Sequence, residues 1–358
     1  MPRRAIFTEV MDVIERRIAE GDYMLKDLPG ERKLAEEVGV SYMTARKAVL
    51  GLIDKQVLSR KANGALEVHP RLAQGEASLA QVALLTPAYP STHFVHCRQV
   101  ISNAADAGRV RFRPVEYVHW RDPVVTEALD GSDGVMVIPS TEPIPGKLLE
   151  QFRSGHRKVV FFDADETAHS IPSIRLFSRR HITALYEHLW SLGHRQIHCL
   201  NAQGRNAEIE RRIDHWRSWL AEKGGEGNLW DTPTPPYGDP TSRGYQTMRS
   251  VLGGGGADLG AVVCTTQPAA IGAMRAAYEA RLTIGREVSI CTINNEPTGQ
   301  YFCPSLTGLD MPDVNSLLER CFNWFAMNGD PFPGELRMEP DEPNLFKGES
   351  TGRALVAV

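Results

Sequence analysis

The sequence predicts an α/β protein in which a short helical region precedes a larger part built from alternating strands and helices. Residues 4–68 carry the apolar spacing of helices, with one short pair of strands at the end. From Gln81 onward, continuous apolar runs alternate with helix-length segments. Buried runs separated by helices are typical of parallel sheets covered on both faces. The number of these units predicts two doubly wound sheets, with one large α/β domain as the alternative.

The N-terminal region has the spacing of three helices. The apolar faces of the first two helices, the first over residues 4–20, are formed by Ile6, Val10, Val13, Ile14 and Ile18 and by Leu34, Ala35 and Val38. We expect the second helix to end at Gly39, because glycine readily adopts the left-handed conformation that closes a helix. The hydroxyl of Ser41 is placed to cap the third helix.

The third helix is expected to bury one side and to expose its start. Its buried stripe consists of Ala45, Ala48, Val49, Leu52 and Ile53. The side chains near its exposed start are Tyr42, Met43, Thr44, Arg46 and Lys47. Hydroxyl, aromatic and guanidinium groups on the first turns of a helix suit the major groove of DNA. We therefore predict that this helix reads DNA.

A β-hairpin is expected directly after the third helix. Its strands, at residues 57–60 and 65–68, flank Asn63-Gly64, a dipeptide suited to a two-residue turn with positive φ at both positions. The segment from residue 42 to residue 61 contains five basic residues and one acidic residue, Asp54. The basic residues are Arg46, Lys47, Lys55, Arg60 and Lys61, and the last two lie near the hairpin tip. This arrangement predicts a winged helix-turn-helix.

The same stretch resembles the DNA-binding domain of GntR-type bacterial transcription regulators. The matching positions are Leu28-Pro29, Glu31-Arg32, Leu34-Ala35, Val38-Gly39-Val40-Ser41, Thr44, Arg46 and Ala48. The resemblance implies that Arg32 contacts a phosphate or base edge and that Arg46 reads a guanine. It also implies that Ser41 and Thr44 contact the DNA backbone. The alternative is a helical pair that serves only as a protein contact.

Three departures from the family pattern predict an altered operator sequence. Gly30 replaces the usual serine, Tyr42 the usual arginine, and Gly64-Ala65-Leu66 the usual Gly-Thr-Phe. The full set of expected DNA-binding residues is Arg32, Ser41, Tyr42, Met43, Thr44, Arg46, Lys47, Arg60, Lys61, Asn63 and Gly64.

Composition separates the two parts of the chain. Residues 1–69 hold 12 basic and 11 acidic residues, whereas residues 70–358 hold 28 and 33. A mildly acidic larger part is expected when one domain reads DNA and another has a different task. The six cysteines show no CxxC spacing, and the sequence shows neither a signal peptide nor an apolar run of 18 residues. We expect a soluble, cytoplasmic protein without membrane contact, and a linker at residues 70–80.

The larger part is expected to contain eight strands and eight helices. The strands lie at residues 82–86, 109–118, 133–138, 158–165, 196–200, 260–264, 288–293 and 306–311. The helices lie near residues 93–107, 123–129, 146–154, 181–194, 207–222, 241–252, 268–280 and 312–327. The proline-rich run at residues 232–240 is expected to be a surface loop.

Several segments of this part resemble the effector-binding part of LacI/GalR-type repressors. They include HLWSLGHRQIHCL, RRIDHWRSWLAEKG, SRGYQTMRSVL, AAIGAMRAAYEARLTIGREVSI and GESTG. The resemblance implies a periplasmic-binding-protein-like fold of two lobes with a ligand between them, over residues 81–358. The first lobe would hold about 81–168 and 302–332, and the second about 169–301 and 333–352. A GntR-type reader joined to such a sensor is similar to arabinose-repressor-type regulators.

The resemblance also implies an effector site. Asp163 matches a ligand-contacting position, and Arg212 matches an arginine that binds sugar hydroxyls. The expected effector-binding residues are Tyr89, Ser91, Phe94, Asp163, Arg212, Thr265, Thr266 and Asn294. The family's ND or TD pair is Thr265-Thr266 here, and its GYDD is Thr292-Ile293-Asn294-Asn295. These changes predict a less charged site, and hence a ligand other than an ordinary neutral sugar or a site that has lost its ligand. Asp163 as a turn cap and Arg212 as a surface residue remain the alternatives.

No metal, cofactor or catalytic site is predicted. His93, His96 and Cys97 have a spacing that could place three metal-ligand types on one helix face, but no fourth ligand is identifiable. No nucleophile motif, zinc-hydrolase motif or phosphate loop is present. We expect a ligand-responsive regulator, a repressor that binds a pseudo-palindromic operator as a homodimer and a sugar-like molecule between its lobes. The alternatives are a constitutive DNA-binding dimer with a vestigial cleft and an α/β enzyme.

Overall fold

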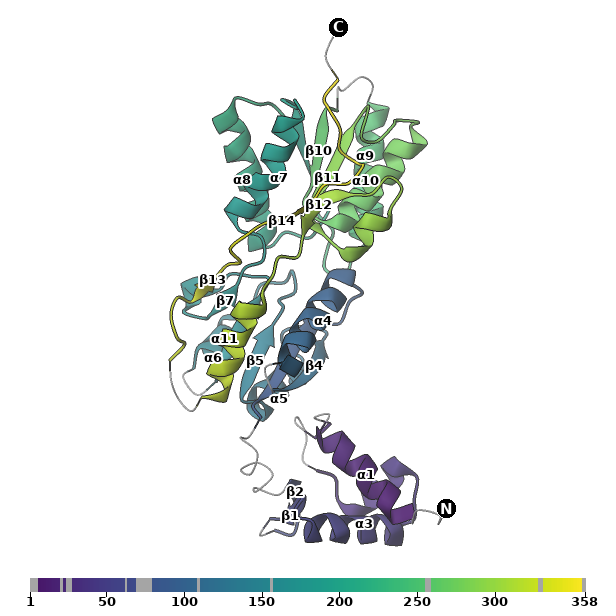
Figure 1. Ribbon diagram of the computed structural model, residues 1–358, viewed down its shortest axis with the longest axis vertical. Coiled ribbons are helices and arrows are strands. Elements are labelled where there is room, and N and C mark those ends of the chain that lie inside the picture. Colours follow the sequence, from purple (N-terminus) through teal and green to yellow (C-terminus); the bar gives the residue numbers. More distant parts are fainter. Residues whose placement is uncertain are drawn as a thin grey trace.

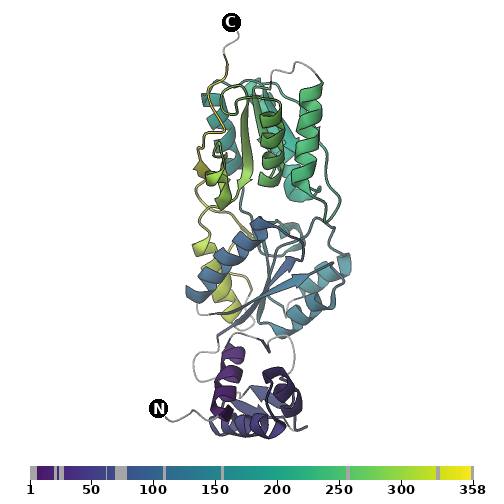
Figure 2. The ribbon, with the colours of Figure 1, turned by 90° about the vertical axis from the view of Figure 1, so that its right-hand side faces the viewer.

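The computed structural model describes residues 6–19, 22–23, 28–61, 63–68, 79–107, 110–154, 157–254, 259–327 and 331–355. A small, mainly helical N-terminal domain lies at one end, followed by two α/β lobes (Figure 1, Figure 2). The linker expected at residues 70–80 lies outside the described residues except for its last two. Among the described residues, no helix is long and apolar enough to cross a membrane.

The N-terminal domain consists of α1 (Ile6–Ala19), α2 (Glu31–Val38), α3 (Tyr42–Asp54), β1 (Leu58–Arg60) and β2 (Leu66–Val68). The three helices and the hairpin expected from the sequence are thus confirmed. The helices and strands share one core, formed by Val10, Met11, Ile14, Ile18, Leu28, Leu34, Ala48, Val49, Leu52, Leu58 and Leu66. Ile6, expected on the buried face of α1, is 64% exposed because α1 begins there and the core starts a turn later.

The caps around the helix–turn–helix are those expected. Gly39 ends α2 with φ +73°, and the Val40 N–H donates to the Ala35 carbonyl at 3.0 Å. The Ser41 hydroxyl oxygen accepts a hydrogen bond from the Thr44 N–H at 3.2 Å and so begins α3. The turn between the two helices is therefore fixed by local sequence.

The hairpin turn differs from the expected two-residue turn. The Gly64 N–H donates to the Lys61 carbonyl, and the Lys61 N–H donates to the Ala65 carbonyl, both at 2.8 Å. Lys61 is therefore paired with Ala65, which is farther along the chain than a two-residue turn allows, and Gly64 supplies the positive φ, +82°, directly before Ala65. The Asn63 side chain accepts from the Ala65 N–H at 3.1 Å, which holds the longer loop in place.

The first lobe is a parallel sheet with strand order β13-β7-β6-β5-β3-β4. Its strands are β3 (Gln81–Pro87), β4 (Arg111–Tyr117), β5 (Gly134–Val137), β6 (Val159–Phe162), β7 (Ser173–Ile174) and β13 (Arg337–Met338). Its helices are α4 (Thr92–Ala107), α5 (Pro123–Gly131), α6 (Gly146–Arg153) and α11 (Asn315–Ala326). Alternate residues of β3 enter different cores, since Leu84 packs on one face and Leu85 on the other.

The second lobe is a sheet with strand order β14-β12-β11-β10-β8-β9, antiparallel only between β12 and β14. Its strands are β8 (Ile197–Asn201), β9 (Leu229–Asp231), β10 (Ala261–Cys264), β11 (Ser289–Asn295), β12 (Thr307–Asp310) and β14 (Asn344–Phe346). Its helices are α7 (Arg179–Ser191), α8 (Ala207–Lys223), α9 (Pro240–Gly253) and α10 (Gln267–Glu279). The prediction of two doubly wound sheets is confirmed, and the eight expected strands and eight expected helices are present. The sheets also contain four short strands that the sequence did not predict: β7, β9, β13 and β14.

The expected division of the chain between the lobes was wrong at three strands. The sequence boundaries placed β12 in the first lobe and placed β7 and β13 in the second. In the structure β7 pairs with β6 and β13 in the first sheet, and β12 pairs with β11 in the second. These strands lie where the chain passes between the lobes, and β7 and β13 have only two residues each, so apolar patterning does not locate them. The outer domain boundaries stay a prediction.

Two glycines allow α9 and α10 to pack closely. A Cβ at Gly272 would overlap the Thr241 carbonyl oxygen and the Tyr245 backbone nitrogen. A Cβ at Gly244 would lie 2.6 Å from the Ala269 carbonyl oxygen. The two helix backbones are therefore in contact, and a side chain at either position would push them apart.

We expect Gly272→Ala to lower the free energy of unfolding by roughly 1–3 kcal/mol, because the added methyl group meets backbone atoms that must shift. The thermal unfolding midpoint of the full chain measures this. The matched control is Gly253→Ala at the end of α9, where an added Cβ meets nothing within 4 Å. Equal midpoints for the two variants would contradict the close packing of these helices.

Candidate functional site

The predicted DNA-binding residues lie on the start of α2, on α3 and on the hairpin. Tyr42 and Met43, in the first turn of α3, are 39% and 67% exposed. Arg46 and Lys47 are also exposed, one turn further along the helix. Figure 1 shows α3 and the β1–β2 hairpin at the end of the molecule that lies away from the second lobe. Their contact with DNA stays a prediction.

A carboxylate that sequence reasoning missed links three parts of this surface. Glu31, at the start of α2, accepts a hydrogen bond from the Tyr42 hydroxyl at 3.0 Å and forms an ion pair with Arg60 of the hairpin. The Arg32 guanidinium lies 5.9 Å from the centre of the Tyr42 ring. The tyrosine in place of the family's arginine is therefore held by neighbours on α2. Tyr42 and Glu31 are 11 residues apart and lie on different helices, so no short-range sequence pattern indicates their contact.

A cavity of about 540 Å³ lies between the two lobes. Its walls come from the loops that follow the strands of both sheets, where ligands of open parallel sheets bind. Seven of the eight predicted effector-binding residues line it: Tyr89, Ser91, Phe94, Asp163, Arg212, Thr266 and Asn294. Thr265 does not line the cavity. It is fully buried, and its hydroxyl donates to Asn201 Oδ1 at 2.7 Å.

Asp163 has the strained backbone common at functional sites. Its φ is +57°, a region that residues other than glycine rarely adopt. One carboxylate oxygen lies 2.8 Å from Nε2 of His93 on α4. Burial lowers the pKa of His93, but its contacts with Cys97 and Asp163 outweigh this and raise the pKa well above 6.5. Asp163 thus forms an ion pair at the cavity wall, which the turn-cap alternative did not foresee.

Arg212 is a buried residue of α8, so the surface-residue alternative is wrong. It is 5% exposed, and its Nη1 donates to the Thr265 carbonyl at 2.8 Å. Its guanidinium lies 5.3 Å from the centre of the Phe177 ring. These contacts fix the guanidinium at the wall of the cavity, and its contact with a ligand stays a prediction.

Three aromatic rings form one side of the cavity. The Tyr89 ring centre lies 5.1 Å from that of Phe94 and 5.3 Å from that of Tyr237. Tyr89 and Phe94 belong to the first lobe and Tyr237 to the second. The Tyr237 hydroxyl also donates to the Val118 carbonyl across the lobes. Sequence reasoning missed Tyr237 because it lies in the proline-rich run that was expected to be only a surface loop.

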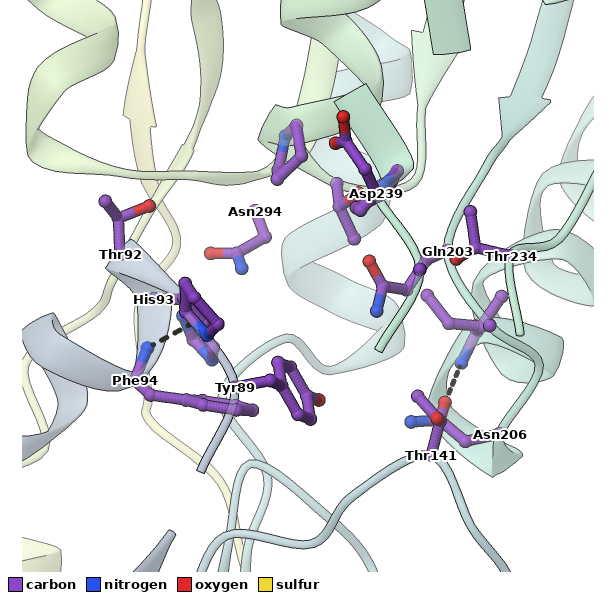
Figure 3. Close-up of a pocket in the computed structure, with 18 of the residues that line it drawn as sticks. Tyr89, Thr92, His93, Phe94, Thr141, Gln203, Asn206, Thr234, Asp239 and Asn294 are labelled. Atoms are coloured by element: carbon purple, nitrogen blue, oxygen red, sulfur yellow. Dashed lines mark hydrogen bonds between the residues drawn. The ribbon is translucent and has the colours of Figure 1, made fainter. Parts of the chain in front are cut away.

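Polar side chains occupy the rest of the wall. Figure 3 shows Thr92, Thr141, Gln203, Asn206, Thr234, Asp239 and Asn294 around the cavity. Asn294 replaces the family's carboxylate, but Glu296 brings a carboxylate to the wall two residues later. Asp163, Glu208, Asp239 and Glu296 line the cavity together with the cationic Arg212 and His93. The wall therefore carries charges of both signs although two of the family's carboxylates are replaced.

The metal alternative is not supported by the geometry. The described residues hold no group of three or more histidine, cysteine and acidic side chains that could hold a metal ion. His93 is directed toward Asp163, and the Cys97 sulfur lies 3.5 Å from its Nε2. His96, on the same helix, does not join them.

Comparisons with known proteins match the two parts of the chain separately. Residues 7–68 match the family "Bacterial regulatory proteins, gntR family", and residues 186–351 match "Periplasmic binding protein-like domain". The HTH-type transcriptional regulator MalR of Streptomyces coelicolor is 26% identical over 279 residues, which cover 75% of this chain and 77% of that protein. The HTH-type transcriptional repressor NagR of Bacillus subtilis is 25% identical over 175 residues, which cover 48% and 70%.

Solved structures share the fold of the larger part. A LacI family regulator from Enterococcus faecium with bound ribose has a TM-score of 0.61 and 19% identity, over 76% of this chain and 98% of that one. The dimeric Lac repressor with an 11-residue C-terminal deletion has a TM-score of 0.61 and 18% identity, over 77% and 100%. The curated relatives are HTH-type transcription regulators rather than enzymes, in agreement with the predicted class.

The His93–Asp163 pair is expected to make the stability of the chain depend on pH. The folded pKa of His93 lies above the ordinary 6.5, so the protonated ring stabilises the folded chain fully below pH 6.5. This stabilisation is lost as the pH rises from there through the folded pKa. We expect the thermal midpoint of the wild type to fall more steeply than that of His93→Gln as the pH rises above about 6.5. His96→Gln is the control and should keep the wild-type slope. Equal slopes for wild type and His93→Gln would contradict the pair's role.

Proposed function

We propose that this chain, a transcription regulator with a GntR-type helix-turn-helix and a periplasmic-binding-protein-like sensor, is a cytoplasmic repressor that responds to a sugar-like molecule. It binds a pseudo-palindromic operator as a homodimer. The observation that carries this proposal is the inter-lobe cavity, lined by aromatic rings, amides, hydroxyls and carboxylates, on the same chain as a winged helix.

The cavity has the size and chemistry of a small polar ligand. Its volume of about 540 Å³ lies within the roughly 300–1,000 Å³ usual for small-molecule sites. The rings of Tyr89, Phe94 and Tyr237 offer apolar faces to the C–H face of a sugar. Gln203 and Asn206 on the second lobe supply both donors and acceptors for hydroxyl groups. The ribose-bound regulator of the same fold supports this ligand class.

The helix α3 and the hairpin provide the DNA-binding surface of one half-site. A reader of this kind uses two copies, because two-fold symmetric half-sites match a protein dyad. The dimeric state given for the Lac repressor, which shares the fold of the sensor, supports the same assembly here. The sensor lobes would then set the separation between the two winged helices.

The two lobes can couple the binding of a ligand to the binding of DNA. The ligand would contact Asp163 of the first lobe and Arg212 of the second at the same time. A molecule that binds one lobe arrangement more tightly shifts the chain toward it. The shift changes the spacing of the two DNA-binding domains in the dimer, and with it the affinity for the operator.

The second candidate is a constitutive DNA-binding dimer. Direct contacts between the lobes favour it, since Tyr237 bonds the Val118 carbonyl and Thr92 bonds the Glu296 carboxylate. Such contacts would hold one lobe arrangement by protein groups alone.

We expect Arg46→Ala to weaken specific operator binding by roughly 1–3 kcal/mol, because the variant loses the predicted guanine contact. Electrophoretic mobility shift against the operator and a scrambled duplex measures the specific part. Arg16→Ala is the matched control, since Arg16 is an exposed base on α1, outside the predicted surface. An unchanged shift for Arg46→Ala would count against α3 as the recognition helix.

We expect a sugar, sugar acid or sugar phosphate to raise the thermal stability of the full chain. A ligand that binds only the folded state adds about 2.7 kcal/mol at about 100 times its dissociation constant. Arg212→Ala and Asp163→Ala should abolish the shift, whereas Glu210→Gln, an exposed α8 residue outside the cavity, should retain it. No stabilisation across the panel would favour the constitutive dimer.

A further inference from the structure

One carboxylate of the cavity is buried among neutral partners. Glu296 follows β11, lines the cavity and is 4% exposed. Its carboxylate accepts hydrogen bonds from the Thr92 hydroxyl across the cleft and from the Gln267 amide at 3.5 Å. Its backbone N–H donates to the Gln267 side-chain oxygen at 2.6 Å. The side chain is therefore fixed in place on the cavity wall by groups that carry no charge.

The other acids of the cavity have a partner or are in water. Asp163 is paired with His93 at 2.8 Å, and Glu208 is paired with Arg211 and, at 3.6 Å, with Arg175. Asp239 is exposed and caps α9 by accepting the Thr241 N–H at 2.9 Å. In the part of the chain that the structure describes, no cation forms an ion pair with Glu296. Glu296 is the buried acid of the cavity without a counter-charge there.

A buried carboxylate with only neutral donors is costly, and a cation placed beside it offsets that cost. The cavity side of Glu296 is the open direction from which such a cation can arrive. We propose that the ligand is a polyhydroxylated amine, that is, an amino sugar whose ammonium group pairs with Glu296. This inference rests on the proposed sensor function and narrows its ligand class.

The remaining cavity groups fit the neutral part of such a ligand. Asn294, two residues before Glu296, is an amide where the family has a carboxylate, so Glu296 is the acid that the end of β11 brings to the cavity. The rings around Tyr89 suit the apolar face of a sugar ring, and Arg212 suits its oxygen atoms. Glu296 would therefore select the amine, while the other side chains bind the hydroxyl groups.

The test compares charged and uncharged ligands of one shape on the full chain. Isothermal titration is carried out with D-glucosamine, D-galactosamine and D-mannosamine, each beside its parent hexose and its N-acetyl derivative. We expect one amino sugar to bind about tenfold or more tightly than its two uncharged counterparts, equal to about 1.4 kcal/mol. Acetylation removes the charge while the ring is kept, so this comparison needs no variant.

The variant Glu296→Gln tests whether Glu296 is the residue that pairs with the ammonium group. The variant keeps the shape and the hydrogen bonds but removes the charge, so the preference for the amine should fall to about onefold. Glu210→Gln, an exposed acid outside the cavity, is the matched control and should keep the full preference.

Any different result overturns either this inference or the proposed function. Hexoses that bind as tightly as their amino sugars would overturn this inference and leave the sugar sensor standing. An amine preference that survives in Glu296→Gln would overturn the role of Glu296. No binding by any hexose, amino sugar or N-acetyl derivative would overturn both this inference and the sugar-like ligand of the proposed function.

Discussion

The path of the chain between the lobes is the constraint on which the sensor depends. The chain passes from one lobe to the other three times, between β7 and α7, between β12 and α11, and between β13 and β14. Each passage delivers an element that the receiving lobe needs. The ring of Phe325 on α11, for example, fills the space that a side chain at Gly134 of β5 would occupy. Neither lobe is therefore formed by one continuous stretch of chain, and a rotation of one lobe relative to the other would have to occur about these three segments.

The same topology explains why residues distant in sequence meet at one cavity. In a parallel sheet the carboxyl ends of all strands lie at one edge, and here those edges face each other across the cleft. Tyr89 follows β3, Asp163 follows β6, and Gln203 follows β8. Thr266 and Glu296 follow β10 and β11 in the same way. The cavity is thus a consequence of strand direction, and its chemistry is set by the first few residues after each strand.

The sequence allowed most of this framework to be predicted because the information is local. Continuous apolar runs located eight strands, and single residues such as Gly39 and Ser41 located helix ends, since each acts through its own backbone. Features that depend on contacts between segments distant in the sequence could not be predicted from it. The link from Glu31 to Tyr42 and Arg60, the two-residue strands at the passages between lobes, and Tyr237 within its proline-rich loop all belong to this group. Glu296 was missed for the same reason, because its hydrogen-bond partners Thr92 and Gln267 lie far from it in the sequence.

Arg175 connects a charged residue of the cavity to the segments that join the lobes. It lies on the first passage, directly after β7, with its Nη1 3.4 Å from Glu339 on the third passage. Its Nε lies 3.6 Å from Glu208 of α8, which lines the cavity and also pairs with Arg211. The Arg175 and Glu208 side chains are 15% and 11% exposed, so water and salt screen this contact only weakly. A change in the charge or position of Glu208 therefore alters the electrostatic environment of Arg175, which contacts two of the three passages. Two of the three segments that join the lobes are in this way linked to α8, the helix that also carries Arg212.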